Sequence, residues 1–262
     1  MIKVAVVGAS GRMGQQVVKA VLNDNECQLT NAIDKFGVGT KINENIIIEE
    51  DIEKSFKNNM PDVVVDFTQP DVIFNNIKLY LNLGVKPVVG TTGLSEEQLI
   101  EIEKLNKEKN VGCLIAPNFS TGAVLMMKFA QIAAKYFNNA EILEFHHNQK
   151  KDAPSGTAIK TAQLMAQENK NMQLGNVAEV ETIAGARGGN FKNSKGEGNI
   201  QIHAIRMPGF MASQEVVFGS DGQTLKIRHD SVNRECYMGG VLMAVKHIYN
   251  SNNFVYGLEN IL

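Results

Sequence analysis

The sequence is poor in cysteine. Its three cysteines, Cys27, Cys113 and Cys236, are far apart and odd in number, and none belongs to a CxxC pair or a Cys/His cluster. This pattern argues against a disulfide framework and against a zinc site, and it favours buried thiols in a reducing compartment. We therefore expect no bound metal.

The sequence also lacks a large net charge and long hydrophobic runs. The 262 residues carry a formal net charge of −2, so no basic field indicates a nucleic acid or an anionic membrane surface as partner. No apolar run is long enough to cross a bilayer, and the start of the chain, MIKVAVVGASG, lacks the apolar core and the cleavage site of a signal peptide. We expect a cytoplasmic protein with no nucleic-acid or membrane partner.

What the first half does contain is an alternation of short β-branched runs with helical patterns. The strand candidates are residues 2–8, 28–34, 62–68, 85–91 and 112–118, and the helical patterns are 12–23, 71–84 and 95–109. This alternation predicts βαβ units and therefore a Rossmann-like, doubly wound parallel sheet of the α/β class. Segment 36–61 fits a short strand, a short helix, or both.

After about residue 118 the regular alternation of strand and helix patterns ends. We expect helices at 120–137 and 156–168, strands at 140–147, 199–207, 213–220 and 223–232, a Gly- and Asn-rich loop over 170–199, and a last helix at 234–250 that packs back on the first domain. We predict two domains. The first comprises residues 1–118 with 234–262, and the second, residues 119–233, is an α+β domain built on a mixed sheet.

A glycine turn follows the first strand. Gly8, Gly11 and Gly14 form a GxxGxxG pattern, with Ser10 where the commoner GxGxxG fingerprint has its second glycine. Such a turn lets a helix N-terminus approach a pyrophosphate, although a simple packing turn is the alternative. Asp34 ends the second strand 20 residues after Gly14, where an acid can accept the ribose hydroxyls of an adenosine, so a dinucleotide site is favoured.

The cofactor's identity stays open. Lys35 could pair with the 2′-phosphate of NADPH, or it could be a surface lysine, and Asp34 taken alone could be a strand-end turn residue. Two loops, GTTG (90–93) and APNFS (116–120), follow the fourth and fifth strands. Each could be turn chemistry alone, but both can face the crevice where ligands of doubly wound sheets bind.

The stretch EFHHNQKKDAPSGTA, residues 144–158, is dense in proton carriers. His146 and His147 should face opposite sides of a strand unless the strand ends there, and histidine can donate a proton near neutral pH. Lys150 can neutralise an anionic substrate or share the proton transfer. The Ser-Gly-Thr turn at 155–157 offers hydroxyl and N–H groups to a carboxylate.

The alternative for this stretch is a purely structural role, as a polar loop followed by a capped helix. The density of HHxxKxDxPSGT favours a site for a small acid that is both anchored and protonated. For the lone histidines His203, His229 and His247 we expect structural roles, although His229 is close to Arg234 in sequence and could line a cleft.

Across its whole length, from VAVVGASGRMG through GTTG, APNFS and HHxxKxDxPSGT to the final helix, the chain resembles the dihydrodipicolinate reductases, also called 4-hydroxy-tetrahydrodipicolinate reductases. The histidine–lysine motif is specific to that family, whereas the glycine turn is not. The resemblance implies reduction of a cyclic 4-hydroxy imino diacid by NADH or NADPH, with loss of water, in lysine and diaminopimelate biosynthesis. It also implies a homotetramer joined through the sheet of the second domain, with the two domains closing over a small dicarboxylate substrate.

The resemblance further implies a role for each motif residue. His146 would be the proton donor and Lys150 the second catalytic residue. The substrate-binding positions would be His147, Ser155, Gly156 and Thr157. The cofactor-binding positions would be Gly8, Ala9, Ser10, Gly11, Arg12, Met13, Asp34, Lys35, Gly90, Thr91, Thr92, Ala116, Pro117, Asn118 and Phe119. In one departure, Gln214 stands where many relatives carry a histidine, so no histidine role transfers to segment 208–214.

Two rival functions remain at this stage. The first is another two-domain oxidoreductase of the same cofactor fold, such as an amino-acid or semialdehyde dehydrogenase. A semialdehyde dehydrogenase would need a nucleophilic cysteine, and neither Cys113 on a buried strand nor Cys236 on a helix suits that role. A nucleotide-binding sensor without catalytic activity would have little reason to keep His146, Lys150 and the Ser-Gly-Thr turn together.

Overall fold

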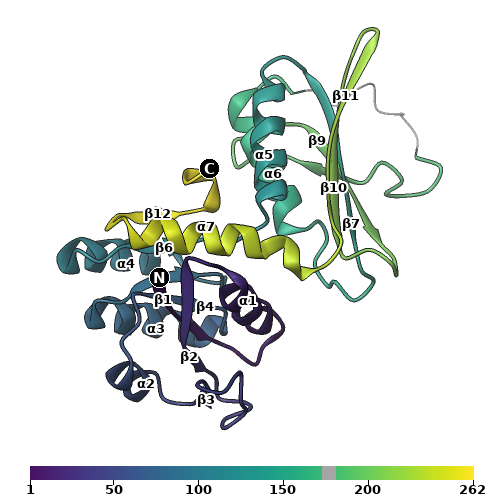
Figure 1. Ribbon diagram of the computed structural model, residues 1–262. Helices are drawn as coiled ribbons and strands as arrows, with labels where there is room; N and C mark the ends of the chain where they lie inside the picture. The colour runs from purple at the N-terminus through teal and green to yellow at the C-terminus, as the bar shows by residue number, and fades with distance from the viewer. Residues whose placement is uncertain (173–180) are drawn as a thin grey trace. The chain divides into compact units, whose positions relative to one another are not determined.

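The computed structural model describes residues 1–172 and 181–262, and part of the loop expected over 170–199 lies outside these residues. The chain divides into two compact units. The first unit comprises Met1–Thr121 and Arg234–Leu262, and the second comprises Gly122–Asn233 (Figure 1).

The first unit is built on a seven-stranded parallel sheet. Its strands are β1 (Ile2–Val7), β2 (Cys27–Ile33), β3 (Ile48–Glu49), β4 (Val63–Asp66), β5 (Lys86–Val89), β6 (Cys113–Ile115) and β12 (Phe254–Tyr256), in the order β12-β6-β5-β4-β1-β2-β3. Its helices are α1 (Arg12–Asn23), α2 (Ile52–Asn58), α3 (Pro70–Leu83), α4 (Glu96–Lys109) and α7 (Met238–Tyr249), with short 3₁₀ turns at Arg234–Tyr237 and Leu258–Asn260. The predicted Rossmann-like α/β fold is confirmed.

Local sequence explains these elements. The central strands β1 and β4 are rich in β-branched residues and, apart from Lys3, are buried, as expected for parallel strands covered by helices on both faces. Ser95 and Gln98 form a reciprocal capping box at the start of α4, and Gly84 ends α3 in the left-handed conformation. Helix α7 packs on β4, β5, β6 and α1 within the first unit, as expected for the last helix.

The second unit is a mixed five-stranded sheet with two helices. Its elements are α5 (Thr121–Ala134), β7 (Asn139–His146), α6 (Gly156–Glu168), β8 (Gly189–Phe191), β9 (Ile200–Arg206), β10 (Ala212–Ser220) and β11 (Gln223–Ser231). The strand order is β11-β10-β7-β9-β8, with β7 and β9 parallel and the other pairs antiparallel. Alanine-rich faces of α5 and α6 pack on Ile142, Ile202, Val216 and Phe218, so one face of the sheet is buried and the other is half-exposed.

Two strands were not predicted. The three-residue strand β8 lies within the expected loop, and the equally short β12 follows the last predicted helix. Neither is long enough to show an alternating pattern, because each is defined by pairing with β9 or β6. Segment 36–61 contains both a strand, β3, and a helix, α2.

Candidate functional site

The glycine turn after β1 is tightly packed. Gly8 has a φ of +84°, and a Cβ on Gly14 would lie 1.9 Å from the Gly8 carbonyl oxygen. The N–H groups of Gly8 and Ala9 both donate to the Ile33 carbonyl, at 2.8 and 3.1 Å. These contacts fix the start of α1 close to the strand end, as a dinucleotide turn requires.

Asp34 ties this turn to the segment after β2. Its carboxylate accepts hydrogen bonds from the N–H of Ser10 at 2.9 Å and from the N–H of Phe36 at 3.0 Å. The Ser10 hydroxyl in turn donates to the Phe36 carbonyl at 2.7 Å. Ser10 therefore has a structural use at the position where the commoner fingerprint has glycine.

A pocket of about 620 Å³ opens beside the turn. Gly8 and Gly11 line one side of it, Asp34 and Lys35 line another, and the loop from β4 to α3 closes it. Its volume falls within the range of small-molecule and cofactor sites. The structure thus gathers predicted cofactor residues from two strand ends around one cavity within the first unit.

The loop after β4 is held by a buried carboxylate. Asp66 is fully buried and accepts hydrogen bonds from Thr68 N and Oγ1, Asn76 Nδ2 and the Tyr80 hydroxyl, at 2.6 to 3.0 Å. Burial raises the pKa of Asp66, against the effect of these hydrogen bonds, which favour the charged form. The network fixes the loop that carries Phe67.

Phe67 joins three loops at the carboxyl edge of the sheet. A Cβ on Gly8 would lie 2.7 Å from the Phe67 carbonyl oxygen, and a Cβ on Gly90 would lie 2.0 Å from the Phe67 ring. The Phe67 and Phe119 rings are 5.8 Å apart. Phe67 therefore lies close to the glycine turn and to the GTTG and APNFS loops, but no residue of these two loops is among those that line the pocket of about 620 Å³. In the GTTG loop, the Thr91 hydroxyl is buried without a hydrogen-bond partner among the described residues.

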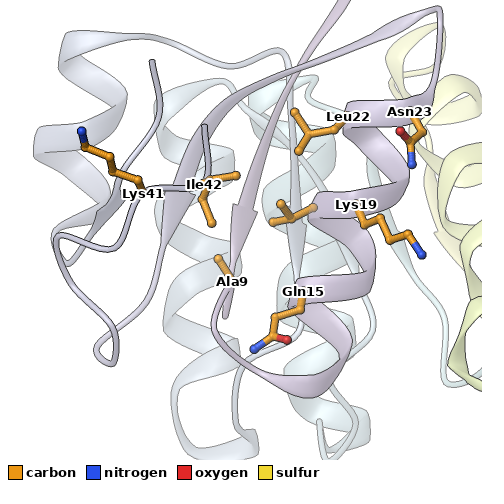
Figure 2. Close-up of a pocket in the computed structure, with 8 residues that line it drawn as sticks. Ala9, Gln15, Lys19, Leu22, Asn23, Lys41 and Ile42 are labelled. Atoms are coloured by element: carbon orange, nitrogen blue, oxygen red, sulfur yellow. The ribbon is translucent and has the colours of Figure 1, made fainter. Parts of the chain in front are cut away.

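A smaller pocket, of about 300 Å³, lies between α1 and the segment around residue 41 (Figure 2). Gln15, on its floor, donates a hydrogen bond to the Ser10 carbonyl at 2.8 Å. Leu22 and Ile42 supply apolar wall, and the side chains of Lys19 and Lys41 point in opposite directions. This pocket does not concentrate positive charge, so the larger pocket is the better cofactor candidate.

In the second unit, a buried carboxylate organises the end of β7. The Glu144 side chain is fully buried, and its carboxylate contacts Nδ1 of His146 and accepts both Nη groups of Arg206, at 2.7 and 3.0 Å. It also accepts the Ser155 N–H at 3.2 Å. Burial raises the pKa of Glu144, but the hydrogen bonds and charges of His146 and Arg206 outweigh it, so the net pKa is lowered. Glu144 is thus an anion at neutral pH.

The loop after β7 carries Lys150. Its ammonium is 2.8 Å from both carboxylate oxygens of Asp152, whose backbone carbonyl accepts Arg206 Nη2 at 2.7 Å. The hydrogen bond from Lys150 lowers the pKa of Asp152. Strand β7 ends at His146, so the expected alternation stops there, and His147 is exposed in the loop.

The predicted Ser-Gly-Thr turn opens helix α6. The Ser155 hydroxyl caps the helix by accepting the Ala158 N–H at 3.2 Å, so this side chain is already engaged. Gly156 and Thr157 are the first helical residues, whose N–H groups have no acceptor within the helix. A Cβ on Gly156 would meet nothing within 4 Å, so this helix end is open.

Sequence reasoning missed three residues, Phe67 in the first unit and Glu144 and Arg206 in the second. Glu144 begins the stretch 144–158, but from sequence alone it resembles an ordinary strand residue. Arg206 lies 62 positions further on, and only the parallel pairing of β9 with β7 brings it opposite His146. Phe67 follows a buried strand, where an aromatic residue is expected to belong to the hydrophobic core. A charged residue on the buried face of a strand was the one available signal for Glu144.

The described residues contain no group of three or more His, Cys, Asp and Glu side chains that could hold a metal ion, and no helix among them is long and apolar enough to span a membrane. Cys113 is fully buried, and burial raises the pKa of its thiol. Burial also raises the pKa of Cys27, to about 11. Neither thiol is suited to act as a nucleophile.

Comparison with known proteins decides the family. Two family models, described as dihydrodipicolinate reductase N-terminus and C-terminus, match residues 2–119 and 122–262. The chain belongs to the dihydrodipicolinate reductase family. The resemblance of its motifs to that family is thereby confirmed.

Individual relatives are similar to this chain over its full length. A 4-hydroxy-tetrahydrodipicolinate reductase of Syntrophomonas wolfei is 48% identical, covering 99% of this chain and 98% of the relative, and one of Bacillus licheniformis is 46% identical, covering 100% and 98%. A solved structure of dipicolinate-bound dihydrodipicolinate reductase from Paenisporosarcina sp. has a TM-score of 0.91 at 41% identity and covers all of both chains. Members of this family reduce their substrate with a nicotinamide cofactor.

Proposed function

We propose that this chain reduces 4-hydroxy-tetrahydrodipicolinate to tetrahydrodipicolinate, consuming NADH or NADPH and one proton and releasing water. The observation that carries the proposal is the cluster of His146 and Lys150 beside the open N-terminus of α6, on a chain that matches these reductases from end to end. Loss of the 4-hydroxyl as water gives a conjugated alkene, the nicotinamide adds a hydride to it, and the carbanionic centre takes a proton.

The cofactor would bind at the glycine turn. The N–H groups of Gly8 and Ala9 are engaged with Ile33, so the first helical N–H groups, those of Arg12 and Met13, are the ones available to a pyrophosphate. They lie at the positive end of the α1 dipole, which favours an anion. The other residues of the turn, Gly8, Ala9, Ser10 and Gly11, are also proposed to lie around the pyrophosphate, with Asp34 and Lys35 at the adenosine ribose. The positions proposed on the nicotinamide side are Gly90, Thr91, Thr92, Ala116, Pro117, Asn118 and Phe119.

Asp34 is proposed to select between the two cofactors. Each of its carboxylate oxygens carries one backbone hydrogen bond, which leaves a second lone pair on each oxygen for a ribose hydroxyl of NADH. The same negative charge repels the 2′-phosphate of NADPH, whereas Lys35, which also lines the pocket, attracts it. The two side chains therefore act in opposite directions.

Replacing Asp34 with alanine should lower the ratio of kcat/KM for NADH to kcat/KM for NADPH by about tenfold or more, since a hydrogen bond to a charged group contributes about 1.5–3 kcal/mol. The ratio is the readout because damage to the turn itself weakens both cofactors equally. Lys35→Ala is the matched variant and should raise the ratio. An unchanged preference in both variants would remove this account of selectivity.

The substrate would bind in the second unit. The N–H groups of Gly156 and Thr157, at the positive end of α6, can hold one carboxylate, and Lys150 can neutralise a second by exchanging Asp152 for the substrate. His146 contacts Glu144 through Nδ1, so its Nε2 is the nitrogen that can donate a proton. His147 and Ser155 flank this arrangement.

Binding of pyridine-2,6-dicarboxylate tests the proposed substrate class. This planar diacid should bind in the presence of NADH, and Lys150→Met should weaken its binding because one carboxylate loses its cation. Isothermal titration calorimetry measures both affinities. A nucleotide-binding sensor or a semialdehyde dehydrogenase would leave this diacid unbound while still binding NADH.

A homotetramer is also proposed, joined through the open face of the second unit's sheet. That face presents Leu143, Phe145, Ile205 and Val217 among charged side chains, and within the described part of the second unit the helices cover the other face. Partly exposed apolar side chains on one sheet face suit contact with a second copy. The buried thiols of Cys27 and Cys113 suit a cytoplasmic location.

A further inference from the structure

We propose that Glu144, clamped by Arg206, is a positioning residue for proton transfer: it fixes the tautomer of His146 and holds the lysine-bearing loop in place. The inference deepens the proposed function and rests on His146 as the proton donor. It concerns two residues, one on β7 and one on β9, to which the sequence motif assigned no role.

Strand geometry places Glu144 and His146 together. The two residues are separated by one position on β7, so their side chains point to the same face of the sheet. The His146 side chain is 15% exposed and the Glu144 side chain is fully buried, so their contact is shielded from water. A carboxylate at Nδ1 requires a hydrogen on Nδ1, and this leaves Nε2 as the nitrogen that gains and loses the catalytic proton. The same carboxylate stabilises the protonated imidazole.

Arg206 keeps this carboxylate charged. It lies directly opposite His146 on the parallel neighbour β9, and its guanidinium grips Glu144 with two hydrogen bonds of 2.7 and 3.0 Å. The Ser155 N–H adds another at 3.2 Å. A buried carboxylate is costly unless it is paired in this way, and a bidentate arginine also fixes its orientation.

The same ion pair ties down the loop that carries Lys150. One end of the loop leaves β7 directly after His146, which contacts Glu144. At the other end, Arg206 binds the Asp152 carbonyl at 2.7 Å, and Glu144 binds the N–H of Ser155. Because both loop ends meet at one buried pair, Glu144 and Arg206 set the positions of both proposed proton carriers.

The chain supplies a matched control on the same strand. Glu141, whose side chain points to the other face of β7, also pairs with an arginine and a histidine: it contacts Arg187, and His203 Nε2 lies 2.8 Å from it. Its side chain is 38% exposed, and it lies on the face of β7 opposite to that of Glu144 and His146. Glu141→Gln therefore removes an equivalent charge from β7 without touching the proposed site.

The experiment compares Glu144→Gln and Glu141→Gln in steady-state turnover. Glu144→Gln should lower kcat by about 10²-fold, within the range that a general acid contributes, and leave KM for NADH unchanged. Glu141→Gln should keep the wild-type kcat and the wild-type KM for NADH. A Glu144→Gln enzyme with both wild-type values would overturn the inference.

Nitrogen NMR of the wild-type imidazoles supplies a readout that needs neither a stable Glu144 variant nor turnover. With the His146 signal assigned by its loss in His146→Gln, the neutral ring should carry its hydrogen on Nδ1. A hydrogen on Nε2 would overturn the inference even in an active enzyme. If the wild-type protein has no reductase activity, the proposed function fails, and the tautomer still decides whether Glu144 positions His146.

Discussion

Replacing His146 with glutamine lowers kcat by about 10²–10⁴-fold, the contribution expected of a general acid, and leaves the affinity for NADH nearly unchanged. Glutamine retains a hydrogen-bonding group near Glu144, but it cannot carry a proton across the reaction. The glycine turn and its pocket belong to the first unit of the chain, whereas His146 belongs to the second. Initial rates and a fluorescence titration with NADH give the two quantities.

His203→Gln is the control for this change. His203 pairs with Leu143 across β7 and β9 and points to the opposite face of the same sheet, where it contacts Glu141. It should keep wild-type turnover. If His146→Gln lost turnover and NADH affinity to the same extent, or lost neither, the assignment of His146 as proton donor would be wrong.

Replacing Gly14 with alanine has the second large effect, a loss of dinucleotide binding together with a loss of stability. The added Cβ would lie 1.9 Å from the Gly8 carbonyl oxygen and 2.9 Å from Ala9 Cα, so α1 must move away from the turn. Overpacking of this kind costs about 1–3 kcal/mol of folding free energy. We expect NADH affinity to fall by at least about tenfold, because the helix end no longer meets the pyrophosphate.

Gly239→Ala provides the comparison for Gly14→Ala. Gly239 is also a helical glycine of the first unit, but an added Cβ there meets nothing within 4 Å. This variant should bind NADH normally and unfold at the same or slightly higher urea concentration, since alanine favours helix over glycine. A Gly14→Ala protein with wild-type unfolding and NADH binding would show that the close approach of α1 to the turn is not needed.

The sequence predicts the first unit well because its signals are local. The glycine turn, the helix at 12–23 and the acid at Asp34 are each encoded within a few residues, and the structure joins them through the hydrogen bond from Ser10 to Asp34. The contacts among the loops that follow β4, β5 and β6 could not be predicted from the sequence. Phe67 contacts Gly90 and lies near the Phe119 ring only because β4, β5 and β6 are neighbours in the sheet.

In the second unit the proposed proton carriers come from one local motif, whereas the residues that contact them come from elsewhere in the sheet. His146 and Lys150 lie in one dense motif, but Arg206 reaches Glu144 through the register of β7 with β9, which no local pattern encodes. The sequence predicted Ser155 as a carboxylate ligand, whereas in the structure its hydroxyl caps α6 and its N–H donates to Glu144, a bond that depends on the path of the whole loop. The strands β8 and β12 escaped prediction for the same reason, since pairing alone defines them.

The most direct test of the central claim is turnover with the substrate made in place. The preceding synthase would form it from pyruvate and aspartate semialdehyde, and loss of reduced-nicotinamide absorbance would be followed with NADH and NADPH in turn, with the Bacillus licheniformis relative as positive control. We predict oxidation of at least one cofactor that depends on the synthase and is inhibited by pyridine-2,6-dicarboxylate. Absence of turnover with both cofactors, in a folded protein that binds NADH and under conditions where the relative is active, would contradict the account.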